Sequence, residues 1–282
     1  MVDVCNARRG LADTSRGVNP VTYARHLGIS SLFRFILTHP DMDHLDGLAD
    51  IFGKFSPLNF FDTNNRKDFG STGFGPYRSV DAEFYLKLRR GAVTGVKRLV
   101  LYAGATGAFY NRGADGAGGG DGLTILAPTP ELVAQANQSG DYNDCSYVLM
   151  YRTSFGSALF CGDAHDRTFE HILARYRRDV TDVDVLIAPH HGRKSGRAYD
   201  FLDVVRPKLT LFGSARSEYL AYSAWRHRHL PYLTSHAAGT IVIDMHTSGL
   251  PVYVTNESCA RKDSATPAYS NWLGAWFWRY VK

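Results

Sequence analysis

The segment that decides the fold reads Thr38-His39-Pro40-Asp41-Met42-Asp43-His44-Leu45-Asp46-Gly47. It places two histidines and three aspartates within positions 39–46. Residues 32–37, just before it, have the length and apolar character of a buried strand, and residues 45–52, just after it, have helical spacing. A turn between a strand and a helix lets short ligands converge, so the segment indicates a metal site. Capping of the helix would need one such residue rather than five.

The composition is that of an ordinary globular protein. With 282 residues, 44% of them hydrophobic, the chain can bury the core of one large α/β domain or of two small ones. No apolar run approaches the ~20 residues of a membrane span, and residues 1–20 contain no signal-peptide stretch. The four cysteines are widely spaced, as in cytoplasmic proteins. We therefore expect a cytoplasmic protein without a membrane partner, and the net charge of +5 favours an anionic substrate.

Two later strands also end in potential ligands. The apolar residues 157–161 lead into Gly162-Asp163, and residues 183–188 lead into Pro189-His190-His191-Gly192. Each ending alone is typical of a turn. Together with the first segment they place carboxylate and imidazole groups at one edge of a sheet, where α/β enzymes carry out their chemistry.

The remaining pattern alternates strands and helices. A short strand is expected at residues 1–5. The glycine-rich residues 103–122 have no apolar period and indicate a surface loop, and they also lack the spacing of a phosphate-binding loop. The aromatic residues 272–280 are expected to pack back on the body of the protein. Helices are predicted at 20–28, 81–90, 131–138 and 166–178, and further strands at 123–128, 147–151, 209–212, 240–243 and 252–254.

Four motifs in order resemble the metallo-β-lactamase-fold hydrolases, and more closely the branch similar to the hydrolase domain of ComEC/Rec2 competence proteins. That branch shows a His-Pro-Asp-x-Asp-His turn, an Asn-x-x-Ser strand, a Leu-x-Gly-Asp and a Pro-His-His-Gly. This chain carries the corresponding motifs at residues 39–44, 143–146, 160–163 and 189–192. The resemblance covers roughly residues 1–245.

The resemblance implies an αββα four-layer sandwich that holds two divalent metals at one rim of its sheets. The whole chain, residues 1–282, would be a single domain with an aromatic C-terminal extension at about 262–282. One metal would bind His39 and Asp41, the other Asp43 and His44, and Asp163 would bridge them, since a carboxylate has two oxygens. One of His190 and His191 would complete the second site. The implied metal ligands are His39, Asp41, Asp43, His44, Asp144, Asp163 and His190.

Two departures from the family pattern bear on these expectations. No histidine lies between His44 and His165, so Asp141, Asn143 or Asp144 would have to substitute for an expected ligand. Oxygen ligands shift the preference from zinc toward manganese or magnesium, and a single metal at Asp43, His44 and Asp163 is an open alternative. In addition, the first strand of the family is not present. Either the start is internal to a longer natural chain, or another element, such as a second copy of the chain in a homo-oligomer or a partner, covers that sheet edge.

The expected activity is metal-dependent hydrolysis of a phosphodiester, with nucleic acid as one candidate substrate. A divalent ion generates hydroxide from water at neutral pH. Asp43 would orient this water, while His191, as the spare histidine of the pair, or His236 would protonate the leaving oxygen. Two alternatives stay open: a lactone or thioester hydrolase of the same fold, and a degenerate module that binds nucleic acid or a partner without turnover.

Overall fold

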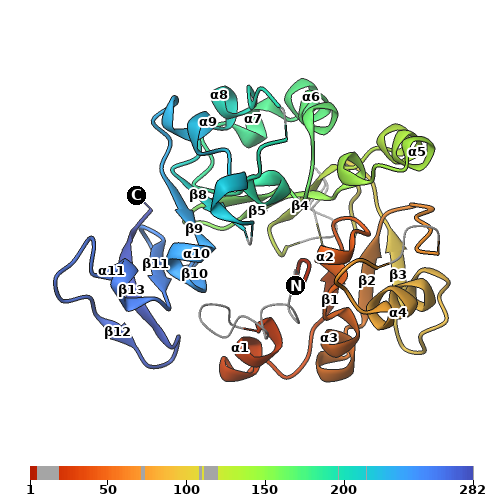
Figure 1. Cartoon of the computed structure of the whole chain (residues 1–282), viewed down its shortest axis with the longest axis horizontal. Helices are drawn as coiled ribbons and strands as arrows, with labels where there is room; N and C mark the ends of the chain where they lie inside the picture. The colour runs from red at the N-terminus through yellow and green to blue at the C-terminus, as the bar shows by residue number, and fades with distance from the viewer. Residues whose placement is uncertain are drawn as a thin grey trace. The chain divides into compact units, whose positions relative to one another are not determined.

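The computed structural model describes residues 1–4, 19–70, 74–107, 110, 120–195, 197–213 and 215–281. The chain divides into two compact units, Met1–Leu101 with Thr129–Ser146, and Tyr102–Pro128 with Tyr147–Lys282 (Figure 1). The single domain over residues 1–282 stays a prediction. Part of the loop predicted at 103–122, and Cys5 of the predicted first strand, lie outside the described residues.

The first unit is built on a parallel sheet in the order β1-β2-β3. Its strands are β1 (Arg34–Ile36), β2 (Asn59–Asp62) and β3 (Lys97–Val100). Its helices are α1 (Pro20–His26), α2 (Met42–Leu45), α3 (Leu48–Phe55), α4 (Ser79–Arg89), α5 (Pro130–Ser139) and the short 3-10 helix η2 (Asn143–Cys145). The segment before β1 also pairs with it, because Val2 forms a parallel bridge with Ile36.

The turn from α2 to α3 explains how the motif of residues 39–46 is held. Gly47 has a φ of 108°, a left-handed conformation that side chains rarely adopt. The buried Asp81 carboxylate of α4 accepts hydrogen bonds from the backbone N–H groups of Gly47 and Ala49. It therefore satisfies the free donors at the start of α3. The helix then buries its apolar face in a core with Phe35 of β1 and Phe60 of β2.

The second unit contains a sheet in the order β4-β5-β6-β7-β8-β9, antiparallel from β4 to β6 and parallel from β6 to β9. Figure 1 shows α6 to α9 on one face of this sheet. The strands are β4 (Leu123–Ala127), β5 (Val148–Arg152), β6 (Ser157–Phe160), β7 (Val185–Ile187), β8 (Leu209–Phe212) and β9 (Tyr232–Thr234). The helical segments are α6 (Asp166–Arg175), α7 (Arg177–Val180), η3 (Pro189–Gly192), α8 (Leu202–Val205), η4 (Ser217–Tyr219), α9 (Tyr222–Arg226) and α10 (Ser235–Ala238).

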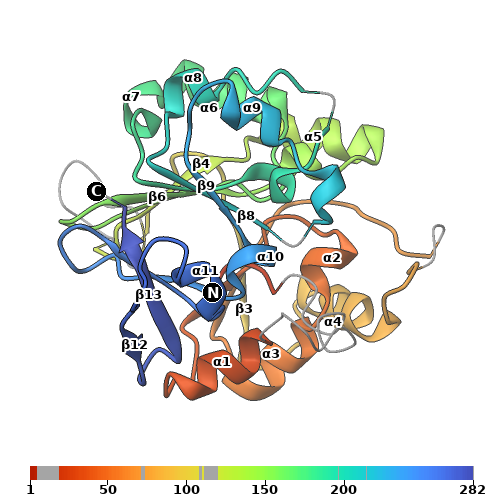
Figure 2. The ribbon, with the colours of Figure 1, turned by 60° about the vertical axis from the view of Figure 1, so that its left-hand side comes forward.

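A second, antiparallel sheet ends this unit, in the order β10-β11-β13-β12 (Figure 2). It comprises β10 (Ile241–Ile243), β11 (Pro251–Val254), β12 (Tyr269–Ser270) and β13 (Ala275–Tyr280), with helix α11 (Glu257–Ala260). Trp278 of β13 shares a core with Leu209 of β8 and Leu233 of β9. Trp278 of the aromatic C-terminal stretch therefore packs on its own unit, whereas Trp272 and Tyr280 are exposed.

These elements establish a mixed α/β fold with several sheets, whereas the four-layer sandwich stays a prediction. Among the described cysteines, Cys145, Cys161 and Cys259 are free and buried. Within the described ranges, no helix combines the length and the apolar character that crossing a bilayer requires.

The first unit contains a buried ion pair, and we expect the effect of its disruption to depend on pH. Asp62 of β2 is 1% exposed and accepts hydrogen bonds from Arg98 Nε (2.9 Å) and Nη2 (2.8 Å). Burial raises the pKa of Asp62, and Arg98 opposes that rise. Arg98→Met leaves a buried charge unpaired and is expected to lower the free energy of unfolding by ~3–5 kcal/mol at pH 7.

The sign of the pH effect follows from the raised pKa. When the folded carboxyl binds its proton more tightly than the unfolded one, stability falls as pH rises from the ordinary Asp pKa of 3.8 toward the raised value. Arg98→Met should therefore cost less stability at pH 4.5 than at pH 7 in urea titrations. Asp62→Asn combined with Arg98→Met should recover part of the loss. An equal loss at both pH values would contradict this account.

Candidate metal centre

The motif of residues 39–46 folds as a tight turn between β1 and α2. Its first histidine, His39, is fully buried, and its Nδ1 lies 3.1 Å from Thr38 Oγ1. This contact directs Nε2 toward Asp41, whose Oδ2 is 3.8 Å away. Asp41 precedes α2 in extended conformation, and its carbonyl accepts a hydrogen bond from the N–H of His44. The rings of His39 and His44 lie edge to face, with centroids 4.2 Å apart.

Asp3 fixes the orientation of His44, a role that the sequence analysis missed. Asp3 Oδ2 lies 2.8 Å from His44 Nδ1 and accepts a hydrogen bond from Thr38 Oγ1, while Oδ1 accepts one from the Thr38 N–H. A carboxylate on Nδ1 leaves Nε2 of the ring as the ligand atom, which is the usual support of a metal-binding histidine. The one signal in the sequence was an acidic residue inside an apolar segment at the N-terminus.

We expect Asp3→Ala to weaken divalent-metal binding roughly 10- to 100-fold, the usual effect of removing such a support. Isothermal titration with Mn²⁺ or Zn²⁺ measures it. Glu83→Ala, which removes an exposed carboxylate of α4, is the matched control and should bind metal like the wild type. Unchanged affinity in Asp3→Ala would refute the positioning role.

In the second unit, Asp163 lies between two histidine rings. It follows β6 through Gly162 and is 3% exposed. The two oxygens of its carboxylate face different rings, with His190 Nε2 3.7 Å from Oδ2 and His191 Nε2 3.7 Å from Oδ1. The backbone of η3 makes this possible, because His190 and His191 are both left-handed, with φ of 51° and 57°.

The distances from the Asp163 oxygens to the Nε2 atoms of His190 and His191 fit ligands of a metal ion better than hydrogen-bond partners. A distance of 3.7 Å is too long for a hydrogen bond. Two donors that bind one tetrahedral ion through bonds of ~2.1 Å lie roughly 3.4 Å apart. One carboxylate and two imidazoles are also a common donor set for zinc and related metals.

His190 has further partners that distinguish it from His191. Its Nδ1 lies 3.1 Å from His165 Nε2 and 3.0 Å from Ser195 Oγ. Burial lowers the pKa of His190 to about 4, with a further lowering from His165 and an opposing effect of Asp163. The ring is therefore neutral at pH 7, as both a metal ligand and a proton acceptor must be. His165 is a second residue that the sequence analysis missed, although it follows Asp163 by only two positions.

Each unit thus carries buried or half-buried His and Asp side chains that could hold a metal ion. They are Asp43 and His44 in the first unit, and Asp163 and His191 in the second. Of the histidine pair, this set contains His191, whose side chain is 9% exposed, against 20% for His190. The ligand roles of His39, Asp41, Asp144 and His190, and the catalytic roles of Asp43, His191 and His236, stay predictions. Asp144 is half-buried in η2, and His236 is exposed on α10.

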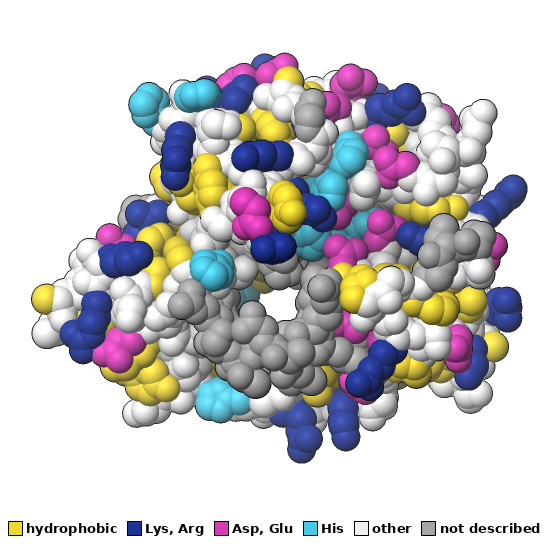
Figure 3. Space-filling model, in the orientation of Figure 1, with side chains coloured by type: hydrophobic (Ala, Val, Ile, Leu, Met, Phe, Trp, Pro, Cys, Tyr) yellow, Lys and Arg dark blue, Asp and Glu magenta, His cyan; other side chains and the backbone are white. Residues whose placement is uncertain are grey.

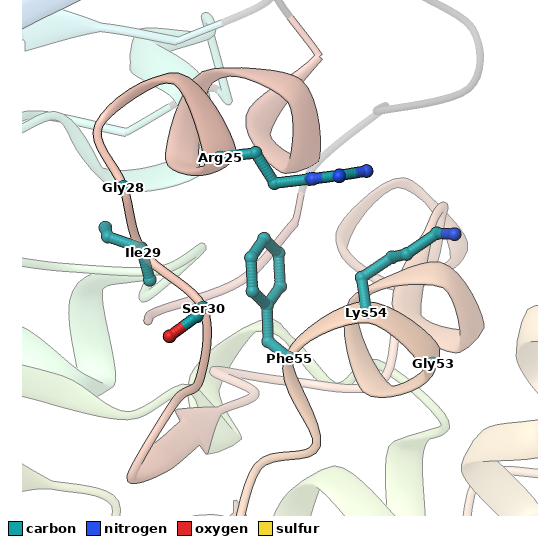
Figure 4. Close-up of a pocket in the computed structure, with 7 residues that line it drawn as sticks. All are labelled: Arg25, Gly28, Ile29, Ser30, Gly53, Lys54 and Phe55. Atoms are coloured by element: carbon teal, nitrogen blue, oxygen red, sulfur yellow. The ribbon is translucent and has the colours of Figure 1, made fainter.

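A separate cavity of about 450 Å³ lies in the first unit, where α1 and α3 end (Figure 4). None of the residues of the 39–46 motif lines it, so it is not part of the candidate centre. Its lining residues are Arg25, Gly28, Ile29, Ser30, Gly53, Lys54 and Phe55.

Basic side chains are scattered over the face drawn in Figure 3, where Lys and Arg alternate with other residue types. Asp and Glu side chains also lie on this face.

Comparison with known proteins gives one weak similarity. No family model matches the chain. Recombination protein 2 of Haemophilus influenzae is 26% identical over 198 residues, which cover 70% of this chain. The chain spans 19% of the length of that protein. The similarity supports a ComEC/Rec2-like relationship loosely.

Proposed function

We propose that the chain is a metal-dependent phosphodiesterase with an αββα four-layer fold. Asp43, His44, Asp163 and His191 are the residues that could hold a divalent ion. The observation that carries the proposal is the Asp163 carboxylate, buried with an imidazole 3.7 Å from each oxygen. A buried carboxylate is costly unless a cation or hydrogen bonds compensate it, and a divalent ion does so fully.

The residues around this centre would have different roles in the reaction. A bound divalent ion would supply Lewis-acid activation of water and neutralise charge on the phosphoryl oxygens. Asp3 holds His44 with Nε2 as the ligand atom. Asp43 would orient the attacking water. Ser195 and His165 fix the ring of His190, which would accept a proton from the attacking water.

Nucleic acid is the substrate class that the similarity favours. The relative is named a recombination protein, and recombination acts on polymers of phosphodiesters. The positive net charge agrees with a polyanionic substrate.

A panel of substrates tests the proposal. The purified protein, supplemented with Mn²⁺, Zn²⁺ or Mg²⁺, is incubated with single- and double-stranded DNA, RNA, cyclic nucleotides, a chromogenic diester, a lactone and a thioester. We expect metal-dependent cleavage of at least one diester and loss of that cleavage with EDTA. Cleavage of the lactone or thioester alone would support the alternative hydrolase. Binding of DNA or RNA without cleavage of any substrate would support a binding module.

A further inference from the structure

Lys67 forms an ion pair with the residue expected to bind a first metal. Its Nζ lies 2.5 Å from Asp41 Oδ1, and the two side chains are 20% and 33% exposed. Both residues belong to the first unit, and they are 26 positions apart in the sequence. The pair is thus a tertiary contact of the motif rather than a local surface pair.

Aromatic rings and backbone hydrogen bonds hold Lys67 in this position. Its ammonium lies 5.7 Å from the ring centre of Phe69 and 5.4 Å from that of Tyr142, within the range of cation–π contacts. Its backbone N–H donates to Asn65 Oδ1 (3.2 Å), and its carbonyl accepts from Arg89 Nη1 (2.9 Å). A lysine with so many fixed contacts differs from the mobile lysines of an ordinary surface.

A buried network of hydrogen bonds supports these contacts. Asn65 is 4% exposed and donates from Nδ2 to the hydroxyl of Tyr85, which is fully buried. That hydroxyl in turn donates to Asp62 Oδ1, whose other oxygen is paired with Arg98. These hydrogen bonds fix Asn65, which in turn binds the backbone of Lys67 and helps to hold its ammonium group opposite Asp41.

The donors on this side do not fit a metal ion. One oxygen of Asp41 is neutralised by Lys67, which leaves the other oxygen and His39 Nε2, 3.8 Å apart. The positive ammonium repels a divalent cation at the same carboxylate.

We propose that the Lys67 ammonium takes the place of the first metal, so that the centre binds a single divalent ion. This inference rests on the proposed function, because it concerns the charge that faces the phosphoryl group at the same site. Lys67 would provide the positive charge on the His39–Asp41 side.

Counting bound metal tests this directly. The full chain is saturated with Mn²⁺ or Zn²⁺, passed through a desalting column and analysed by mass spectrometry for metal per chain. We expect about one ion in the wild type and about two in Lys67→Ala, because removal of the ammonium frees Asp41. His39→Ala added to Lys67→Ala should return the count to one, and Lys67→Arg, which keeps the charge, should stay at one.

Controls separate the possible failures. Lys54→Ala, which removes an exposed lysine of α3, should stay at one ion, and thermal melting confirms that each variant is folded. If Lys67→Ala does not fold, Lys67→Met preserves the aliphatic packing and replaces it. Two ions in the wild type, or one in both the wild type and Lys67→Ala, would overturn this inference and leave the proposed function standing. No ion in the wild type would overturn both.

Discussion

Replacement of Asp163 by alanine is expected to lower metal-dependent cleavage of a phosphodiester by roughly a thousandfold or more, the usual scale for loss of a group that acts as part of a catalytic unit. The physical reason is the position of the carboxylate between His190 and His191, 3.7 Å from each Nε2. Without it, the imidazoles of His190 and His191 remain, but the anionic ligand between them is lost. Rates with saturating Mn²⁺ and a chromogenic diester provide the measurement.

The control for this variant is Asp166→Ala, which removes an exposed carboxylate three positions further along the chain. It should retain the wild-type rate and the wild-type metal content. If Asp163→Ala kept a tenth or more of the activity while remaining folded, the assignment of the centre to this residue would be wrong.

Replacement of His44 by alanine should remove bound metal and also destabilise the protein. His44 is 2% exposed, and its Nδ1 lies 2.8 Å from Asp3 Oδ2. Truncation takes away the ligand atom and leaves a nearly buried carboxylate without that partner, which costs ~1–3 kcal/mol. We expect less than one tenth of an ion per chain after desalting, together with a lower midpoint of urea unfolding.

His26→Ala, which removes an exposed histidine at the end of α1, is the matched control and should keep its metal. Asp163→Ala and His44→Ala also test the proposal as a pair, since the two residues belong to different units. If each variant alone loses its metal, both residues are needed for metal binding. If His44→Ala retained a full complement of metal, the ion would belong to the second unit alone.

The parts of the site that follow directly from a strand could be predicted from the sequence. The strand before residue 38, the helix beginning near residue 48 and the strand before Asp163 all have apolar periodicity that fixes which residues face the core. The ligand types next to those strand ends were therefore visible in the sequence. The strands at 240–243 and 252–254 were also predicted, because both are short apolar runs, and they correspond to the paired β10 and β11.

The missed parts depend on contacts between distant positions. Asp3 and His44 are 41 positions apart, and Lys67 and Asp41 are 26 apart. No periodic pattern marks a single acid or lysine that meets a ligand through tertiary structure. The strand at 232–234 was missed for a similar reason, since three residues with one buried side chain give no recognisable alternation.

The left-handed backbone of His190 and His191 has a consequence for affinity. For residues with a Cβ atom this conformation is costly, and two in succession persist only because their surroundings hold them: the His190 N–H donates to Gly162, and the His191 carbonyl accepts from Gly213. The conformational entropy of ordering this loop is thus lost when the protein folds. The two imidazoles are therefore already ordered before a cation binds, and ordering of the chain would offset little of the binding free energy.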